Sequence, residues 1–368
     1  MAKGKTKTAQ DRQLQTPESV AGMLAAFDPN APGNTAAGIY GLPFTPENAR
    51  VVILPMPWEV TVSYGAGAAR GPEAVWHASF QVDLYNEDIA DAWKTGIAME
   101  EIPQAWVKRN AKLRKKAKEV IALLEQGKHP VHHEKLAALL GEVNQGGRDL
   151  NAWVKQRSLA HLEAGQLVVV LGGDHSAPLG LMQALAEKHP DFAILHVDAH
   201  ADLREAYEGF EYSHASIMFN ALKLPQVQQL VHVGIRDYCD AEAQLIRTSG
   251  GRVQAFTGRA LARMLFRGES WQHICQTIVG TLPQKVYISF DIDGLDPVLC
   301  PHTGTPVPGG LSFEEACFLV ETVVNAGKQI IGCDLCEVAP GDDEWDGNVG
   351  ARLLYRLCTL MAKSHEQA

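Results

Sequence analysis

Short, uninterrupted apolar segments recur along this chain and alternate with segments of helical pattern. Apolar residues at nearly every position are typical of strands in a parallel sheet that is covered on both faces. Six segments are expected strands: Arg50–Pro55, Leu167–Leu171, Ala193–Val197, Leu230–Gly234, Lys285–Phe290 and Gln329–Leu335. Helical segments such as Ala177–Lys188 and Phe313–Asn325 lie between them. This order predicts an α/β fold, a three-layer α/β/α sandwich with a mostly parallel central sheet.

Composition narrows the class of protein further. The chain has 368 residues, 46% of them hydrophobic, and a formal net charge of −10 at pH 7. A chain this acidic is a poor partner for nucleic acid. It contains no apolar run of about 18 residues, so we expect no membrane span. The polar start and the seven cysteines predict a soluble, cytoplasmic protein whose cysteines are thiols.

The two ends of the chain and one insertion depart from the strand–helix alternation. We expect residues 1–20 to form a disordered tail, 21–47 an amino-terminal arm, and 48–368 a single domain. The insertion at about 101–165 has apolar residues at helical spacing and many lysines and arginines on its other faces. We interpret those faces as a solvated basic surface, with a partner or subunit contact as the alternative.

Histidines and aspartates follow three of the expected strands. They come in three sets: His175 in the motif GGDHS, then Asp198, His200 and Asp202, and finally Asp291 and Asp293. Residues two apart on an extended backbone point to the same side. Because ligands of such sheets bind beyond the carboxyl ends of the strands, the three sets are expected to meet at one edge.

Four aspartates brought together would repel one another and raise each other's pKa. Two divalent cations balance four carboxylates, so the sequence predicts a binuclear metal site. Carboxylates with two imidazoles suit manganese, with nickel or cobalt as alternatives. Such a pair of ions lowers the pKa of a shared water and favours hydrolysis. Acidic residues near the motifs, such as Glu205, Asp237 and Glu337, favour a cationic small substrate such as a guanidinium.

Three further features near the motifs are interpreted as supporting structure. We expect His196 to be out of phase with Asp198 and to pack into the layer behind the sheet. Asp174 is expected to support the ligands rather than to bind metal. Cys333 and Cys336 form a lone CxxC pair on an expected core strand, and no second pair completes a zinc site.

On these residues the chain resembles the ureohydrolases, the arginase and agmatinase family of binuclear manganese enzymes. The resemblance covers about residues 48–362 and rests on four segments: Gly172–Ser176, Asp198–Asp202, Ser289–Pro297 and Glu337–Pro340. It implies one metal held by His175, Asp198, Asp202 and Asp291, and a second held by Asp198, His200, Asp291 and Asp293.

The same resemblance implies catalytic roles and a substrate. His214 would shuttle protons at the pocket mouth, Glu337 would hold the guanidinium, and Asp202 would help to pass a proton to the leaving amine. Segments 203–216 and 303–310 are agmatinase-like, and the Asn- and Ser-rich loop of arginases is missing. We therefore expect a guanidino C–N bond to be hydrolysed with release of urea, most simply agmatine to putrescine. Guanidinobutyrate, guanidine, a biguanide, arginine and formiminoglutamate stay open, since Arg204 could receive a carboxylate tail.

Two other classes of protein remain as alternatives. A metal-dependent deacetylase would keep one zinc and usually a catalytic tyrosine, and a non-catalytic subunit would not need the ligands; the intact set of six argues against both. The resemblance suggests a homo-oligomer, a trimer or a hexamer. The insertion and the arm are unlike compact relatives and could cover the pocket mouth or a subunit interface.

Overall fold

The computed structural model describes residues 17–366, so most of the predicted tail at 1–20 lies outside the described residues. Within this range the strands form one eight-stranded parallel sheet in the order β2-β1-β3-β8-β7-β4-β5-β6. The strands are β1 (Val51–Pro55), β2 (Ile97–Met99), β3 (Leu167–Leu171), β4 (Phe192–Val197), β5 (Val227–Val233), β6 (Val253–Phe256), β7 (Lys285–Asp291) and β8 (Gln329–Cys336). The prediction of a parallel sheet is confirmed.

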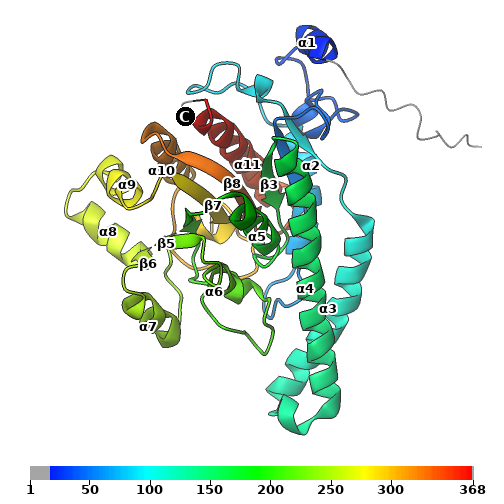
Figure 1. Ribbon diagram of the computed structural model, residues 1–368, viewed down its shortest axis with the longest axis vertical. Coiled ribbons are helices and arrows are strands. Elements are labelled where there is room, and N and C mark those ends of the chain that lie inside the picture. The colour runs from blue at the N-terminus through cyan, green and yellow to red at the C-terminus, as the bar shows by residue number, and fades with distance from the viewer. Residues whose placement is uncertain (1–16, 367–368) are drawn as a thin grey trace, which may run out of the picture.

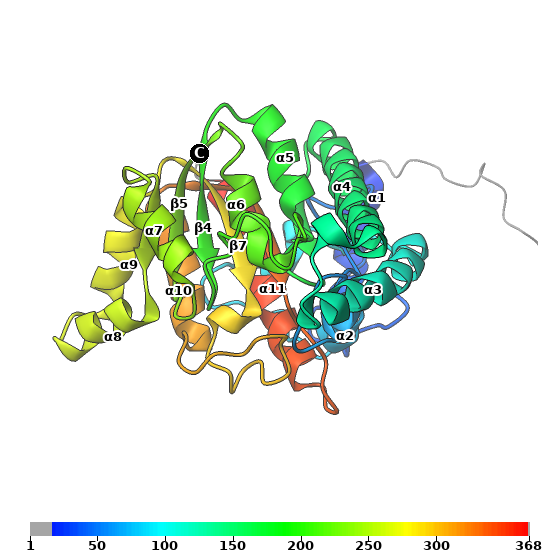
Figure 2. The same cartoon turned by 90° about the horizontal axis from the view of Figure 1, so that it is seen from below.

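Helices cover both faces of this sheet (Figure 1). The described α-helices are α1 (Pro17–Ala26), α2 (Gly71–Ser79), α3 (Gln104–Glu125), α4 (Glu134–Glu163), α5 (Leu179–Lys188), α6 (Ile217–Ala221), α7 (Asp240–Thr248), α8 (Gly258–Phe266), α9 (Trp271–Gly280), α10 (Phe313–Asn325) and α11 (Trp345–Ser364), and α1 lies apart from the sheet. Helices α2, α10 and α11 pack together on one side, and α4, α5 and α6 on the other (Figure 2). The predicted α/β/α sandwich is therefore confirmed.

The inner strands match the prediction because their apolar side chains are buried on both faces. Every residue of β1, β3 and β4 is buried. Strands β2 and β6 were not predicted; they are the two edge strands and have only three and four residues. An edge strand pairs on one side only and carries too few residues for a clear apolar run.

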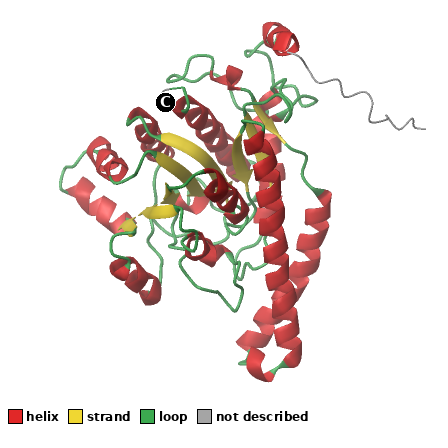
Figure 3. Ribbon diagram, in the orientation of Figure 1, coloured by secondary structure: helices red, strands yellow, loops and turns green. Residues whose placement is uncertain are grey.

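The insertion at 101–165 is a helical hairpin of α3 and α4 that extends beyond the rest of the molecule (Figures 1 and 3). Trp106, Leu113, Ala117 and Val120 are buried, as their helical spacing predicts. The arm begins with α1 and then enters the core, where Tyr40 is buried and donates a hydrogen bond from Oη to the carbonyl of Ala351 (2.9 Å).

The cysteines are free thiols, and all except Cys239 are buried. Burial raises the pKa of the Cys333 and Cys336 thiols well above the ordinary value, which agrees with a packing role on β8. Among the described helices, none combines the length and apolar character that crossing a membrane requires.

Candidate metal centre

The predicted ligands meet at one edge of the sheet because the strands that precede them are neighbours. Strands β3, β8, β7 and β4 lie side by side in this order. His175 follows β3, Asp198 follows β4, and Asp291 ends β7. Parallel strands place their carboxyl ends at the same edge, so segments far apart in sequence converge there.

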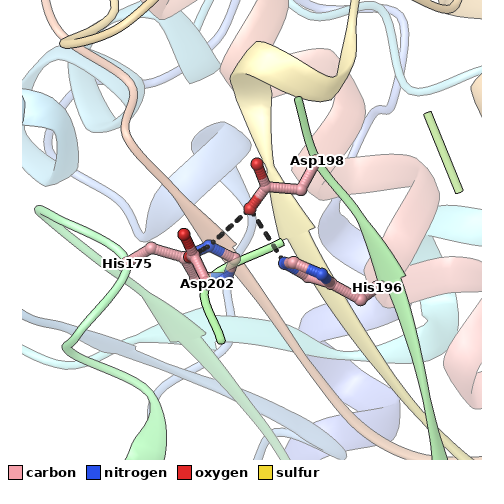
Figure 4. Close-up of side chains that lie close together, drawn as sticks. All are labelled: His175, His196, Asp198 and Asp202. Atoms are coloured by element: carbon pink, nitrogen blue, oxygen red, sulfur yellow. Dashed lines mark hydrogen bonds and ion pairs between the residues drawn. The ribbon is translucent and has the colours of Figure 1, made fainter. Parts of the chain in front are cut away.

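Three carboxylates converge on one nitrogen of His175. Its Nδ1 lies 3.1 Å from Asp198 Oδ2, 3.3 Å from Asp202 Oδ2 and 3.4 Å from Asp291 Oδ2. All four residues are buried, and Figure 4 shows the imidazole, Asp198 and Asp202 facing one another. A cation at this point would have one imidazole and three carboxylates within reach.

A second group shares Asp198 with the first. His200 Nδ1 lies 3.0 Å from Asp293 Oδ2 and 3.4 Å from Asp198 Oδ1. The two oxygens of Asp198 therefore face different imidazoles. The side chains of Asp198, His200 and Asp293 lie close enough together to hold one ion, and His175, Asp198 and Asp202 another. This arrangement offers two adjacent cation positions that share one carboxylate.

The electrostatics of the group fit divalent cations. Burial, with Asp293 and Asp198 nearby, raises the pKa of Asp291 well above its ordinary value. Burial and Asp198 raise the pKa of Asp202 to about 6. Asp293 Oδ2 is buried and makes no hydrogen bond, because His200 Nδ1, although 3.0 Å away, is not aligned for one. Several carboxylates buried together are costly unless their charge is balanced, and metal ions would balance it.

A buried relay behind His175 orients its ring. His175 Nε2 is 2.9 Å from Ser289 Oγ, and Ser289 Oγ donates to Asp334 Oδ2 at 2.9 Å. Tyr287 Oη donates to the same carboxylate oxygen at 2.6 Å. With Nε2 as the donor, Nδ1 would be free to present its lone pair to a bound metal ion, as metal-bound imidazoles require. The role of these residues was not predicted from the sequence, although the position of Asp334 inside the apolar strand β8 is a signal that could have indicated it.

The prediction for His196 was wrong. It lies two residues before Asp198, so on an extended strand both side chains point the same way. His196 Nε2 is 2.8 Å from Asp198 Oδ2 (Figure 4), and its Nδ1 is 2.8 Å from Nδ1 of His232 on β5. The His196–Asp198 contact is close but not aligned for a hydrogen bond. His196 therefore borders the metal centre.

Asp174 belongs to none of the described groups of side chains that could hold an ion. Its Oδ1 accepts hydrogen bonds from the amide (3.0 Å) and hydroxyl (2.5 Å) of Ser176, while its Oδ2 is buried without a partner. Burial raises the pKa of Asp174 to about 7. It braces the turn that carries His175, and its supporting role stays a prediction.

A cavity of about 300 Å³ opens beside the metal centre. Its wall contains His200, Asp202 and His214 of the predicted site residues, together with Ser63, Tyr64, Arg204, Tyr207, Ala215, Asp237, Tyr238, Cys239, Glu242 and Thr305. Burial and the nearby His200 and His175 lower the pKa of His214 to about 4, so this imidazole is neutral at pH 7. Its ring meets that of Tyr207 edge-on, with centroids 6.2 Å apart.

Glu337 adjoins the centre from the end of β8 and does not line the open cavity. Its Oε1 accepts a hydrogen bond from the amide of His175 (2.9 Å). Burial, then the nearby Asp174, raises the pKa of Glu337 well above its ordinary value. Glu337 and Asp202 both have a positive φ, 63° and 53°, and such strained residues cluster at functional sites.

Comparison with known proteins agrees with this geometry. The model of the Arginase family matches residues 49–360. The chain is 34% identical over 323 residues to an N(1)-aminopropylagmatine ureohydrolase of Thermus thermophilus, covering 88% of this chain and 94% of the relative. It is 27% identical over 300 residues to an agmatinase of Bacillus anthracis, covering 82% and 87%.

Solved structures show the same fold. The agmatine ureohydrolase of Thermoplasma volcanium superimposes with a TM-score of 0.66 at 22% identity, covering 94% of this chain and 99% of that one. An arginase of Bacillus subtilis gives a TM-score of 0.60 at 20% identity, covering 84% and 98%. The fold and the matched residues define a hydrolase of guanidino compounds. The chain belongs to the arginase family and is one of its ureohydrolases.

Proposed function

We propose that this ureohydrolase cuts agmatine into urea and putrescine with two divalent ions bound, manganese in preference to nickel. The observation that carries the proposal is the convergence of four buried aspartates and two histidines at one sheet edge, beside an open cavity. Under this proposal, His175, Asp198, Asp202 and Asp291 hold one ion, and Asp198, His200, Asp291 and Asp293 hold the other.

When bound, the two ions would supply a water whose pKa is lowered toward neutrality. The residues around the ions bind the substrate and transfer protons. Although Glu337 does not line the open cavity, we assign the guanidinium to it, because it is a buried carboxylate beside the metal centre whose Oε1 accepts a hydrogen bond from the amide of His175. A guanidinium would relieve the uncompensated burial that raises the pKa of Glu337.

Proton transfer falls to Asp202 and His214, which both line the cavity. The Asp202 carboxylate, which lies in the cavity wall, can take up a proton and give it to the leaving amine nitrogen. His214 is neutral at pH 7 because its pKa is lowered to about 4. It can therefore accept a proton from inside the cavity and return it to solvent.

The cavity wall supports a cationic tail on the substrate. Tyr64, Tyr207 and Tyr238 offer three aromatic rings, and Asp237 adds a carboxylate. An ammonium over such rings gains about 0.5–2 kcal/mol per contact. Arg204 lies over the Tyr207 ring (5.0 Å to the centroid), and its Nε is 4.0 Å from Glu242 Oε2. Glu242 thus offsets part of the positive charge that would attract a carboxylate tail.

A panel of guanidino compounds tests the proposal. Purified chain, loaded with manganese or with nickel, is assayed for urea from agmatine, guanidinobutyrate, arginine, guanidine, a biguanide and N(1)-aminopropylagmatine. The last compound is included because relatives that share 34% identity carry its name. We expect agmatine to have the highest kcat/KM and manganese to give the higher rate. Urea released only from a compound other than agmatine would refute agmatine as the substrate.

A variant pair tests the role of Glu337. Glu337→Gln should lower kcat/KM on agmatine by about 30-fold or more, since losing one partner of a buried charge pair costs about 2–5 kcal/mol. Glu163→Gln is the matched control, because that carboxylate is exposed at the end of α4 and pairs only with Lys188 at 3.2 Å. Equal losses of kcat/KM in the two variants would contradict the assignment of Glu337 to guanidinium binding.

We also propose that the enzyme acts in the cytoplasm as a homo-oligomer, a trimer or a hexamer, without nucleic-acid or membrane partners. Support comes from the free thiols and from the family resemblance. Light scattering of the purified chain measures the oligomeric state, and a monomer at micromolar concentration would contradict this part.

A further inference from the structure

Two loops that lie far apart in sequence form the mouth of the cavity. The first mouth loop, residues 56–67, follows β1 and contributes Ser63 and Tyr64 to the wall. The second mouth loop, residues 203–213, runs between the aspartates after β4 and the His214 turn, and contributes Arg204 and Tyr207. Both loops contact the α3–α4 hairpin, as the hydrogen bonds of Asn110 and Asn144 show.

Helix α4 holds the second mouth loop through one buried amide. Asn144 is 8% exposed, and its Nδ2 donates to the carbonyl of Gly209 (3.1 Å). Its Oδ1 accepts from the amide of Glu211 (3.0 Å). One side chain therefore satisfies a carbonyl and an amide on either side of Phe210, as the backbone of a neighbouring strand would.

The backbone that Asn144 holds is a tight turn that begins at Tyr207. The amide of Tyr207 donates to the carbonyl of Phe210 (3.2 Å), and the amide of Phe210 donates back to Tyr207 (2.8 Å). Glu208 and Gly209, the two residues between them, have φ values of 54° and 82°. Left-handed backbone at a non-glycine residue persists only where its surroundings fix it. Asn144 is one such restraint.

Close packing also holds the second mouth loop against α4. A Cβ added to Gly147 would lie 2.7 Å from Tyr212 Cβ, and one added to Gly209 would lie 2.9 Å from Leu140 Cδ2. Arg148 also pairs with Glu211 at 3.1 Å, but both side chains are about half exposed. An exposed pair of this kind contributes little, so it provides a matched control.

Helix α3 holds the first mouth loop in a similar way. Asn110 Oδ1 accepts from the amide of Glu59 (2.8 Å), and Arg114 Nη1 donates to the carbonyl of Val60 (3.2 Å). Arg114 is half-buried, so the interpretation of all these basic residues as a solvated surface was wrong at this position. Ion pairs of Arg109 with Asp149 and of Lys116 with Glu142 tie α3 to α4.

We infer that the α3–α4 hairpin clamps both mouth loops, and that Asn144 is a positioning residue that fixes Tyr207 and so sets the affinity for the tail of the substrate. The kinetic consequence rests on the proposed function, whereas the clamp itself does not. The insertion thereby belongs to the architecture of the cavity, although its residues do not line the wall.

Hydrogen–deuterium exchange on the metal-loaded full chain tests the clamp without any substrate. Asn144→Ala should speed amide exchange in residues 204–213 by about tenfold, since two buried hydrogen bonds are lost. Strand β4 should be unchanged, and Arg148→Ala should match the wild type. Asn144→Asp keeps the acceptor for Glu211 but loses the donor to Gly209, so it should be intermediate, and it replaces the alanine variant if that one fails to fold.

Kinetics on agmatine test the positioning role. Asn144→Ala should raise KM about tenfold, equal to about 1.4 kcal/mol, while kcat changes less than about threefold because the metal ligands are untouched. A general loss of fold would lower kcat instead. Unchanged exchange in residues 204–213 overturns the clamp, and faster exchange with an unchanged KM overturns the positioning role. Absence of urea from the wild type refutes the proposed function and leaves the exchange result to decide the clamp.

Discussion

Replacing Ser289 by alanine should weaken metal binding although Ser289 is not a predicted ligand. Its hydroxyl is 2.9 Å from His175 Nε2 and donates to Asp334 at 2.9 Å. Removing it takes the closest acceptor away from a buried imidazole N–H and leaves Asp334 Oδ1, 3.5 Å from Nε2, as a distant substitute. Asp334 itself keeps the hydrogen bonds from Tyr287 Oη (2.6 Å) and the Phe290 amide (3.2 Å). The cost therefore falls on His175 rather than on the carboxylate.

The size of the effect follows from burial. His175 and Ser289 are both 0% exposed, so water does not readily replace the lost partner. An unsatisfied buried polar group costs about 1–3 kcal/mol. If most of this cost arises because Nδ1 is no longer held toward the metal, the affinity for the ion beside His175 falls by about 10–100-fold. This is the range typical of residues that orient metal ligands.

Titration of Mn²⁺ into the metal-free chain, by calorimetry or chelator competition, measures this affinity. Ser158→Ala is the matched control, since Ser158 is also 0% exposed but its hydroxyl has no hydrogen-bond partner. We expect Ser158→Ala to bind as the wild type does. A Ser289→Ala variant that binds both ions with wild-type affinity would refute the reasoning that the relay orients His175.

Three further predictions concern stability. Removing the ions with a chelator should lower the free energy of unfolding by about 4 kcal/mol for each ion relative to protein at 1,000 times the dissociation constant, and an unchanged Tm would argue against bound metal. Gly173→Ala should destabilise the fold by about 1–3 kcal/mol or more, because the new Cβ would lie 2.0 Å from the carbonyl oxygen of Trp58. Gly141→Ala adds its Cβ in open space and should stabilise α4 by up to about 1 kcal/mol. Urea unfolding measures both changes. The hydrogen bond to Glu100 raises the pKa of His161 above its ordinary 6.5, so this contact stabilises fully below that pH and is lost as pH rises through the raised pKa. The Tm advantage of the wild type over His161→Gln should shrink as pH rises above about 6.5 and through the raised pKa of His161, and an advantage independent of pH would contradict it.

The sequence predicted the fold because the information was local. Uninterrupted apolar runs located six of the eight strands, and their alternation with helices predicted the layers. The edge strands β2 and β6 were missed because a short strand that pairs on one side needs no long apolar run. The order in which the strands pair depends on contacts distant in sequence, and no local pattern encodes it.

The candidate site was predictable to the extent that its residues occur as motifs. The alternating aspartates and histidines after β3, β4 and β7 were found, and the structure brings them together. Ser289, Tyr287 and Asp334 were missed because only the folded sheet places them behind His175. Asn144 has no motif at all, since its role depends on a hairpin that meets a loop more than sixty residues later. His196 was misplaced by an error in strand phase.

The most direct test of the central claim follows the oxygen of water into the product. Metal-loaded chain is incubated with agmatine in water enriched in ¹⁸O, and the products are identified by mass spectrometry. Hydrolysis at the guanidino carbon predicts urea that carries the heavy oxygen, together with an equal amount of putrescine. Release of ammonia with a carbamoylated amine, or no reaction of any guanidino compound with two ions bound per chain, would contradict the account.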